Sequence, residues 1–234
     1  MSTTVFLALV GPTCIGKTRY AHEIISEFPL ELVSVDSFQV YSFFRMGTGR
    51  ADLQANHAHL YGFRDPREIL SSELYLTLVN EALDEISSNG NYPLFEGGSI
   101  SYIKALLQHY TLKIIGLKPR DSAHAVDLID QRIASTSEEL LISEIAEGLR
   151  RGYRDTIIMR DDVVYLPYVE YLTGSISLAD VHRRVRKNLL RRYQTQMEEY
   201  EGLSVEWFIP SDHSLAEIRG VIDQFLAAQA RESA

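Results

Sequence analysis

The sequence predicts an α/β fold in which helices cover both faces of a mainly parallel sheet. Three observations support this prediction. Short apolar runs alternate with segments of helical periodicity over about the first 120 residues, and this alternation is typical of parallel strands joined by crossover helices. A glycine-bounded turn follows the first apolar run. After about residue 121 the pattern becomes mainly helical.

The first half of the chain is expected to supply most of the sheet. Its apolar runs are short and bounded by turn signals, as buried parallel strands are, and they cover residues 5–10, 31–36, 92–98 and 111–119. Helices are expected from the glycine-bounded turn to about residue 28, within residues 65–90 and over residues 99–110. The second of these helices ends at Asn89-Gly90, a common stop signal.

The second half is expected to be mainly helical, with one returning strand. Periodicity predicts helices over residues 126–134, 137–151, 178–200 and 215–230, and a strand over residues 205–212. There is no internal repeat and no low-complexity linker. We therefore expect a single domain over residues 1–234, with a sheet core in 1–120 and a helical half in 121–234.

Composition is that of an ordinary soluble protein, with 45% hydrophobic and 24% charged residues. The net charge of −9 argues against a broad nucleic-acid surface. Basic residues gather in His182–Gln194, either on a solvated helix face or on a phosphate-facing surface. Cys14 is the only cysteine, and no signal peptide or membrane span is evident. The chain is therefore expected in the cytoplasm without a membrane partner, and its oligomeric state stays open.

Residues Gly11–Thr18, "GPTCIGKT", match the phosphate-binding pattern G-x-x-x-x-G-K-[ST] between an expected strand and an expected helix. The glycines let consecutive N–H groups converge on one anion at the positive end of a helix. Lys17 adds a positive charge, and the Thr18 hydroxyl suits a Mg²⁺ ligand. The fold prediction thus becomes a P-loop NTPase-like sheet. The motif alone serves hydrolysis, phosphoryl transfer and reactions in which diphosphate leaves.

Two more segments, Val33–Asp52 and Leu94–Leu107, are expected at the carboxyl edge of the sheet, where ligands bind. With the P-loop, "VDSFQVYSFFRMGTGRAD" and "LFEGGSISYIKALL" resemble the successive motifs of the isopentenyltransferase superfamily. That family comprises tRNA dimethylallyltransferases and the adenylate dimethylallyltransferases of cytokinin biosynthesis. Arg160–Glu199 and Val205–Asp212 are similar to the C-terminal segments of the tRNA enzymes. The resemblance thus spans nearly the whole chain.

This resemblance implies a prenyltransferase that joins a dimethylallyl group from dimethylallyl diphosphate to N6 of adenine, releasing diphosphate. By the same resemblance Asp36 is the general base on N6, Thr13 bonds the bridging oxygen of the donor, and Arg132 clamps the diphosphate. The chemistry is consistent, because a carboxylate can take the proton of a weakly nucleophilic amine. Cationic groups stabilise the charge that develops on the leaving group.

The remaining contacts implied by the resemblance hold the substrates and the metal. The P-loop holds diphosphate with Mg²⁺ on Thr18, Thr48 and Arg50 face the acceptor, and Asp161 approaches its ribose or phosphate. The expected substrate-binding residues are Gly11, Cys14, Gly16, Lys17, Thr18, Ser37, Gln39, Thr48, Arg50, Gly97, Gly98, Ser99, Asp161 and Gln196.

Some positions depart from the family pattern or allow another role. Val163 replaces a second aspartate of the adenylate enzymes, and Gln196 stands where the tRNA group has arginine and the adenylate group histidine. Asp36 could instead cap a helix or act behind a Mg²⁺ ion. Arg132 could form a surface ion pair, and Glu96 could either orient the P-loop or cap a turn.

The expected acceptor is free AMP, with tRNA argued against as a partner. The tRNA enzymes of the family carry an insertion after the "KALL" helix, whereas here the next expected strand begins a few residues later. An acidic chain without that insertion has little to hold a polyanion. Three alternatives stay open: a tRNA adenine dimethylallyltransferase without the insertion, a P-loop kinase of a small metabolite using "LRRGYRD" as a lid, and a non-catalytic nucleotide-binding module.

Overall fold

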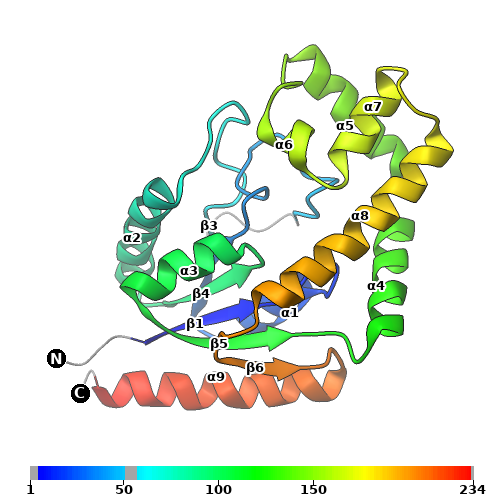
Figure 1. The fold of residues 1–234 in the computed structure, drawn as a ribbon. Coiled ribbons are helices and arrows are strands. Elements are labelled where there is room, and N and C mark those ends of the chain that lie inside the picture. Colours follow the sequence, from blue (N-terminus) through cyan, green and yellow to red (C-terminus); the bar gives the residue numbers. More distant parts are fainter. Residues whose placement is uncertain (1–4, 51–56, 233–234) are drawn as a thin grey trace.

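Strands of the chain form one sheet in the order β3-β2-β4-β1-β5-β6, and every neighbouring pair is parallel. This computed structural model describes residues 5–50 and 57–232. The strands are β1 (Val5–Val10), β2 (Leu30–Val35), β3 (Ala58–His59), β4 (Tyr92–Gly97), β5 (Thr111–Leu117) and β6 (Val205–Phe208). The α/β fold class with a parallel sheet and flanking helices is confirmed (Figure 1).

The two faces of the sheet are buried under different helices. Along β1, Ala8 and Val10 belong to one apolar cluster, whereas Leu7 and Leu9 belong to the other. This alternation follows from the two-residue period of a strand. The first cluster includes side chains of α2 (Ser72–Ser88) and α3 (Ile100–His109). The second includes side chains of α1 (Lys17–Ile25) and α9 (Asp212–Glu232).

Helix ends follow local signals that the sequence carries. α2 begins where the Ser71 side chain accepts a hydrogen bond from Leu74 N, and it ends before Gly90, which adopts φ +75°. The long helix α8 (Leu178–Glu199) begins with a capping box between Ser177 and Asp180. These caps explain why the helix positions agree closely with the periodicity.

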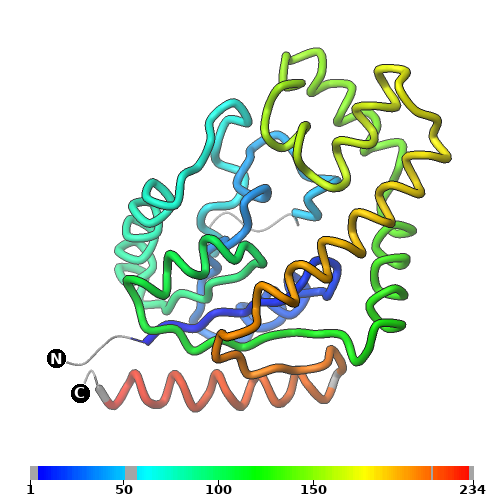
Figure 2. Tube along the Cα trace, viewed as in Figure 1, coloured from blue at the N-terminus to red at the C-terminus, as the bar shows by residue number. Residues whose placement is uncertain are grey.

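The helical half contains α4 (Ser122–Ser135), α5 (Glu138–Arg150), α6 (Ile157–Asp161), α7 (Tyr165–Leu172) and α8. Figure 1 shows α5, α6 and α7 grouped together, and the trace in Figure 2 shows α8 running from this group back toward β6. β3, α6 and α7 were not expected from the sequence. Pro167 obscures α7, although a proline in the first helical turn removes no helical hydrogen bond.

The expectations about a membrane span, the acceptor-side segment and the domain boundary have different outcomes. No helix within residues 5–50 and 57–232 is long and apolar enough to cross a membrane. The last two residues of the expected acceptor-side segment Val33–Asp52 lie outside the described residues. The boundary near residue 120 falls between β5 and α4, and the single-domain organisation stays a prediction.

Candidate active site

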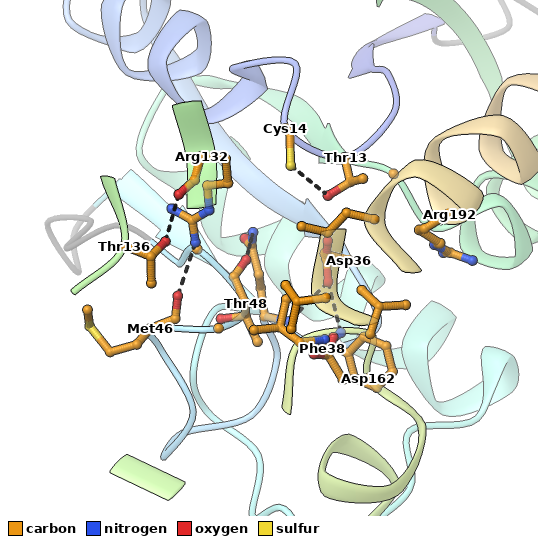
Figure 3. A pocket seen from close by; sticks show the side chains of 18 of the residues that line it. Thr13, Cys14, Asp36, Phe38, Met46, Thr48, Arg132, Thr136, Asp162 and Arg192 are labelled. Atoms are coloured by element: carbon orange, nitrogen blue, oxygen red, sulfur yellow. Dashed lines mark hydrogen bonds between the residues drawn. The ribbon is translucent and has the colours of Figure 1, made fainter. Parts of the chain in front are cut away.

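A cavity of about 640 Å³ lies where the carboxyl ends of β1, β2 and β4 meet the helical half (Figure 3). Its volume is within the range of small-ligand sites. The turns that follow the three strands form one wall, and α4, α5, α7 and α8 contribute to the other. The expected site residues that line it are Thr13, Cys14, Gly16, Lys17, Thr18, Asp36, Ser37, Gln39, Thr48, Gly98, Ser99, Arg132 and Gln196.

The P-loop adopts a tightly curled conformation between β1 and α1. Gly16 has φ +90°, and Cys14 also lies in the left-handed region with φ +66°. A Cβ on Gly11 would lie 2.5 Å from the Leu117 carbonyl oxygen, so only glycine fits there. Lys17 Nζ donates to the Pro12 carbonyl at 3.0 Å, which folds the ammonium back over the turn. The result is a cationic cradle at the N-terminus of α1, suited to an anion.

Glu96, at the end of β4, connects the P-loop helix to the sheet. Its side chain is 1% exposed and accepts hydrogen bonds from Thr18 Oγ1 at 3.4 Å and from Tyr61 Oη at 2.7 Å. Burial raises the pKa of Glu96, and the Lys17 ammonium opposes this shift. Burial likewise lowers the pKa of Lys17, which Glu96 opposes. These contacts favour the role of orienting the P-loop over that of capping a turn.

The oxygen donors beside Thr18 suit magnesium. The Thr18 hydroxyl and the Glu96 carboxylate are hard oxygen ligands of the kind that Mg²⁺ prefers. Within the described ranges, no group of three or more His, Cys, Asp or Glu side chains is arranged to hold a metal ion. A Mg²⁺ ion at Thr18 would therefore take its other ligands from diphosphate and water, and the residues present fit that role.

Two side chains of the α8 end hold the P-loop from behind. The Gln196 amide is 4% exposed; its Oε1 accepts from Thr13 N at 2.8 Å, and its Nε2 donates to the Gly98 carbonyl at 3.0 Å. The Tyr200 hydroxyl both accepts from Gly11 N at 3.1 Å and donates to Gly11 O at 3.2 Å. Gln196 therefore joins the turns after β1 and β4, a structural role that the sequence comparison with acceptor-binding residues did not suggest.

Gln196→Leu is expected to lower the free energy of unfolding by about 2–4 kcal/mol, because it leaves two largely buried backbone groups without a partner. Urea denaturation monitored by circular dichroism measures the change. Gln194→Leu is the matched control, because Gln194 is exposed on the same helix. Equal losses in the two variants would contradict the assigned role of Gln196.

Asp36 lies just after β2 and presents its carboxylate to the cavity. Its Oδ1 accepts from Phe38 N at 2.8 Å and Gln39 N at 3.1 Å, so the carboxylate caps the turn that follows the strand. Among the described residues, Oδ2 has no hydrogen-bond partner. Gln39 Nε2 donates to the Thr48 carbonyl at 3.3 Å, while its buried Oε1 has no partner within the described ranges. Asp36 Oδ2 is thus available to a ligand, and Gln39 Oε1 is a buried acceptor without a partner in the part of the chain that the structure describes.

Thr48 and Arg50, the residues expected to face the acceptor, both bond to backbone carbonyls of their own loop, and their acceptor contacts stay a prediction. Thr48 lines the cavity, but its hydroxyl donates to the carbonyls of Phe44 and Arg45 within its own turn. The Arg50 guanidinium donates to the carbonyls of Tyr41 and Ser42 and does not line the cavity. Arg50 therefore braces the loop, because its side chain turns toward the preceding backbone.

Of the adjacent aspartates at the end of α6, Asp162 lines the cavity rather than the expected Asp161. Asp161 is exposed at the end of α6, whereas Asp162 is 7% exposed and lines the cavity. Asp162 Oδ1 accepts from Val164 N at 2.8 Å and Tyr165 N at 3.0 Å. Burial raises the pKa of Asp162 to about 6, although these two hydrogen bonds oppose the shift. The chain leaves the helix at this point, so adjacent aspartates face opposite directions.

Asp162→Asn is expected to change the pH dependence of stability. Because the folded-state pKa of about 6 lies above the ordinary 3.8, ionisation of Asp162 costs the folded chain stability as pH rises from about 4 to 6. Asparagine keeps the Oδ1 acceptor and removes this loss, which is at most ~3 kcal/mol. Urea unfolding at pH 4 and pH 8 should show the variant gaining on the wild type at the higher pH. A difference independent of pH would contradict the assignment.

Two arginines approach the cavity from different helices. Arg132 of α4 donates through Nη2 to the Met46 carbonyl at 3.0 Å, and in Figure 3 it stands on the opposite side of Asp36 from Arg192. Arg192 was not singled out from the sequence. It belongs to a face of α8 whose members recur every three or four residues along the cavity, namely His182, Val185, Leu189, Arg192 and Gln196. Helical spacing from Gln196 was the signal that could have identified it.

The arginines of the first turns of α8 do not share this position. Three arginines of α8 are exposed and form ion pairs on the outside of the helix: Arg183 with Asp180, Arg184 with Glu170, and Arg186 with Asp130. The solvated-face reading therefore holds for these three arginines, and the phosphate-facing reading stays a prediction for Arg192, which lines the cavity. Among the described residues, Arg150 and Arg151 pair with Glu147 and lie outside the cavity, so "LRRGYRD" supplies no lid over the P-loop.

Gly11 and Gly97, both expected to contact substrate, do not line the cavity. They are required for packing behind it. A Cβ on Gly97 would lie 2.2 Å from the Val35 carbonyl oxygen of the neighbouring strand. Gly98 does line the cavity, and its own Cβ would lie 3.0 Å from Gly11 O. The two turns can approach each other only because these positions lack side chains.

Comparison with known proteins identifies relatives of the chain. The model of the family described as IPP transferase matches residues 39–114. A tRNA dimethylallyltransferase of Roseiflexus sp. (strain RS-1) is 33% identical over 144 residues, which cover 60% of this chain and 46% of the relative. The chain thus spans about half the length of that relative. One of Thermoanaerobacter sp. (strain X514) is 22% identical over 305 residues, covering 94% of this chain and 97% of the relative.

Solved structures share the fold. The chain is similar to a full-length tRNA isopentenylpyrophosphate transferase from Bacillus halodurans, with a TM-score of 0.82, 22% identity and 99% of both chains covered. It is also similar to a eukaryotic dimethylallyltransferase described as acting on tRNA, with a TM-score of 0.75 and 14% identity, covering 97% of this chain and 80% of the other. At these identities the likeness concerns the fold.

The comparisons correct one expectation drawn from the sequence. Dismissal of tRNA as a partner is wrong, because the relatives in sequence and in fold are named as enzymes that act on tRNA. An acidic net charge and a missing insertion do not exclude tRNA as a partner. The absence of the insertion from this chain is consistent with the comparison, because the alignment with the Thermoanaerobacter relative is 305 residues long and this chain has 234.

Proposed function

We propose that this chain is a prenyltransferase of the IPP transferase family and transfers a dimethylallyl group from dimethylallyl diphosphate to N6 of an adenine in tRNA. The observation that carries the proposal is that the P-loop and Asp36 line the same cavity. The P-loop suits a diphosphate, and Asp36 suits the role of a proton acceptor beside an amine. The family match at residues 39–114 and the named relatives support the same chemistry.

On this proposal the P-loop binds the diphosphate of the donor. Backbone N–H groups at the start of α1, with Lys17, hold the phosphate oxygens. Arg132 and Arg192, which both line the cavity, add positive charge where the leaving group becomes more negative. Thr13 is assigned to the bridging oxygen. Magnesium bound at Thr18 would supply a further positive charge to the diphosphate.

Asp36 acts on the acceptor. The N6 nitrogen forms a bond to C1 of the dimethylallyl group as the bond from C1 to the bridging oxygen breaks and diphosphate leaves. The amine becomes positively charged as it reacts, and Asp36 takes its proton through the unpartnered Oδ2. We assign the second N–H of the amine to Gln39 Oε1, which is buried beside the cavity without a partner in the described part of the chain.

The acceptor is assigned to tRNA because the relatives in sequence are named tRNA dimethylallyltransferases. The chain lacks residues that the Thermoanaerobacter relative possesses, since their alignment is longer than the whole chain. The missing segment predicts a smaller contact with the nucleic acid. Weaker tRNA binding with a shallower dependence on salt is the expected consequence, because fewer phosphates are contacted.

Mass spectrometry tests the proposal. Purified protein is incubated with Mg²⁺, dimethylallyl diphosphate and either unmodified tRNA or AMP, and the products are digested to nucleosides. Prenylated adenosine from the tRNA reaction is the expected result. Prenylated AMP without prenylated tRNA would replace tRNA by the free nucleotide as acceptor. Formation of ADP from ATP with no prenylated adenine would overturn the reaction type in favour of a kinase.

A further inference from the structure

The loop of residues 45–49, here called the clamp loop, lines the cavity but is held by side chains outside it. Its cavity-lining members are Met46, Gly47, Thr48 and Gly49. The half-buried Glu144 of α5 accepts from Arg45 N through Oε2 at 2.8 Å. The same carboxylate accepts from Met46 N, at 3.2 Å to Oε1 and 3.3 Å to Oε2.

Tyr165 of α7 completes the contact. Its side chain is fully buried, and its hydroxyl accepts from Gly47 N at 3.0 Å and donates to Glu144 Oε1 at 2.5 Å. Burial raises the pKa of Tyr165 well above its ordinary value, which keeps the phenol able to donate. Three consecutive backbone N–H groups thus bond to one carboxylate and one hydroxyl, as in an anion-binding concavity filled by the protein's own groups.

Close packing leaves little freedom in this arrangement. A Cβ on Gly47 would lie 2.4 Å from the Tyr165 ring, so the backbone of the loop rests directly on the aromatic side chain. Tyr165 is itself packed edge-on against Phe44, with ring centroids 5.0 Å apart. The loop position is therefore determined by Glu144 of α5 and Tyr165 of α7, which lie more than 90 residues later in the sequence.

The clamp loop in turn contacts groups assigned to the reaction. The Met46 carbonyl accepts from Arg132 Nη2 at 3.0 Å, and the Thr48 carbonyl accepts from Gln39 Nε2 at 3.3 Å. Gln39 N donates to Asp36 Oδ1. A continuous series of hydrogen bonds therefore joins Glu144 and Tyr165 to the general base and to one cation of the diphosphate site.

We propose that Glu144 and Tyr165 are positioning residues for prenyl transfer, which fix the clamp loop so that its carbonyls orient Gln39 and Arg132. This inference rests on the proposed function. Neither side chain lines the cavity, so each acts through the loop rather than on substrate. Small displacements of reacting groups lower rates strongly, by about 10²-fold for 1 Å. Their loss should therefore reduce kcat more than donor binding.

The variants Tyr165→Phe and Glu144→Gln test the inference. We expect each to lower kcat for tRNA prenylation about tenfold or more, with KM for dimethylallyl diphosphate changed less than threefold. The double variant should lose much less than the product of the two single losses, because the residues share one hydrogen bond. Tyr20→Phe is the matched control: Tyr20 is buried in the other apolar cluster, and its hydroxyl exchanges two hydrogen bonds with the Ser211 backbone. Its kcat should stay within twofold of wild type.

Hydrogen exchange supplies a readout that does not depend on activity. The amides of Arg45, Met46 and Gly47 should exchange slowly in the wild type and Tyr20→Phe, and faster in the Tyr165 and Glu144 variants. Fast exchange in the wild type would overturn the clamp. Faster exchange with unchanged kcat would overturn its positioning role. Absence of prenyl transfer by the wild type would instead contradict the proposed function. If Tyr165→Phe does not fold, Glu144→Gln alone tests the inference.

Discussion

Asp36→Asn is expected to lower kcat for prenyl transfer by about 10²–10⁴-fold while leaving donor binding measurable. The substitution keeps the Oδ1 acceptor for Phe38 N and Gln39 N, so the turn after β2 remains formed. It removes the basicity of the side chain, and it places an amide NH₂ at the position where the adenine amine must donate its proton. Steady-state kinetics with saturating tRNA measures kcat, and isothermal titration with dimethylallyl diphosphate measures donor affinity.

Asp65→Asn provides the control for this experiment. Asp65 Oδ1 accepts from Arg67 N at 2.8 Å in a comparable turn, but its side chain is 43% exposed and does not line the cavity. Its kcat should match wild type. An Asp36→Asn enzyme with more than a tenth of wild-type kcat would exclude Asp36 as the general base and leave it the role of a turn cap.

Lys17→Met is expected to lower kcat/KM for dimethylallyl diphosphate by about 10²–10³-fold, because it removes a preorganised charge from the leaving diphosphate. The ammonium lies over the P-loop turn, 3.0 Å from the Pro12 carbonyl oxygen. Methionine has a similar length and flexible packing, so the effect reports charge rather than volume. Initial rates over a range of donor concentrations give the ratio.

Lys104→Met is the matched control, since Lys104 is exposed on α3 and does not line the cavity. It should keep wild-type kcat/KM. Because Lys17 and Glu96 oppose each other's pKa shifts, the Lys17 variant also leaves a buried carboxyl without its cation. Circular dichroism of each variant under the assay conditions checks that a loss of activity does not come from a loss of folding. Equal activity of the two variants would contradict donor binding by the P-loop lysine.

The parts of the site that sequence could predict are those encoded by contiguous residues. The P-loop is a local pattern, and its φ angles at Gly16 and Cys14 follow from eight neighbouring residues. Asp36 could be predicted for the same reason, because it ends an apolar run whose carboxyl edge faces ligand in this fold. Local signals such as the Ser71 cap likewise determined where helices begin.

Contributions from the helical half could not be predicted in this way. Arg192 and Asp162 reach the cavity, and Glu144 and Tyr165 reach the clamp loop, only after α4–α8 pack over the sheet. Apart from the helical spacing that relates Arg192 to Gln196, no short pattern marks them. Asp161 was preferred to Asp162 because sequence similarity cannot tell which of two adjacent carboxylates turns inward where α6 ends. The α7 segment was missed because Pro167 conceals it. Long-range packing, rather than propensity, decides these positions.

Attachment of α8 to the P-loop through Gln196 and Tyr200 has a consequence for how the two substrates of the proposed reaction interact. The same helix lines the cavity over four turns, from His182 to Gln196. A ligand that tilts α8 by binding near its N-terminal end would change the shape of the P-loop, which contacts the C-terminal end of the helix. Thermodynamic linkage then requires the effect to be reciprocal. If a bound nucleic acid changes the affinity for diphosphate by some factor, bound diphosphate changes the affinity for that nucleic acid by the same factor.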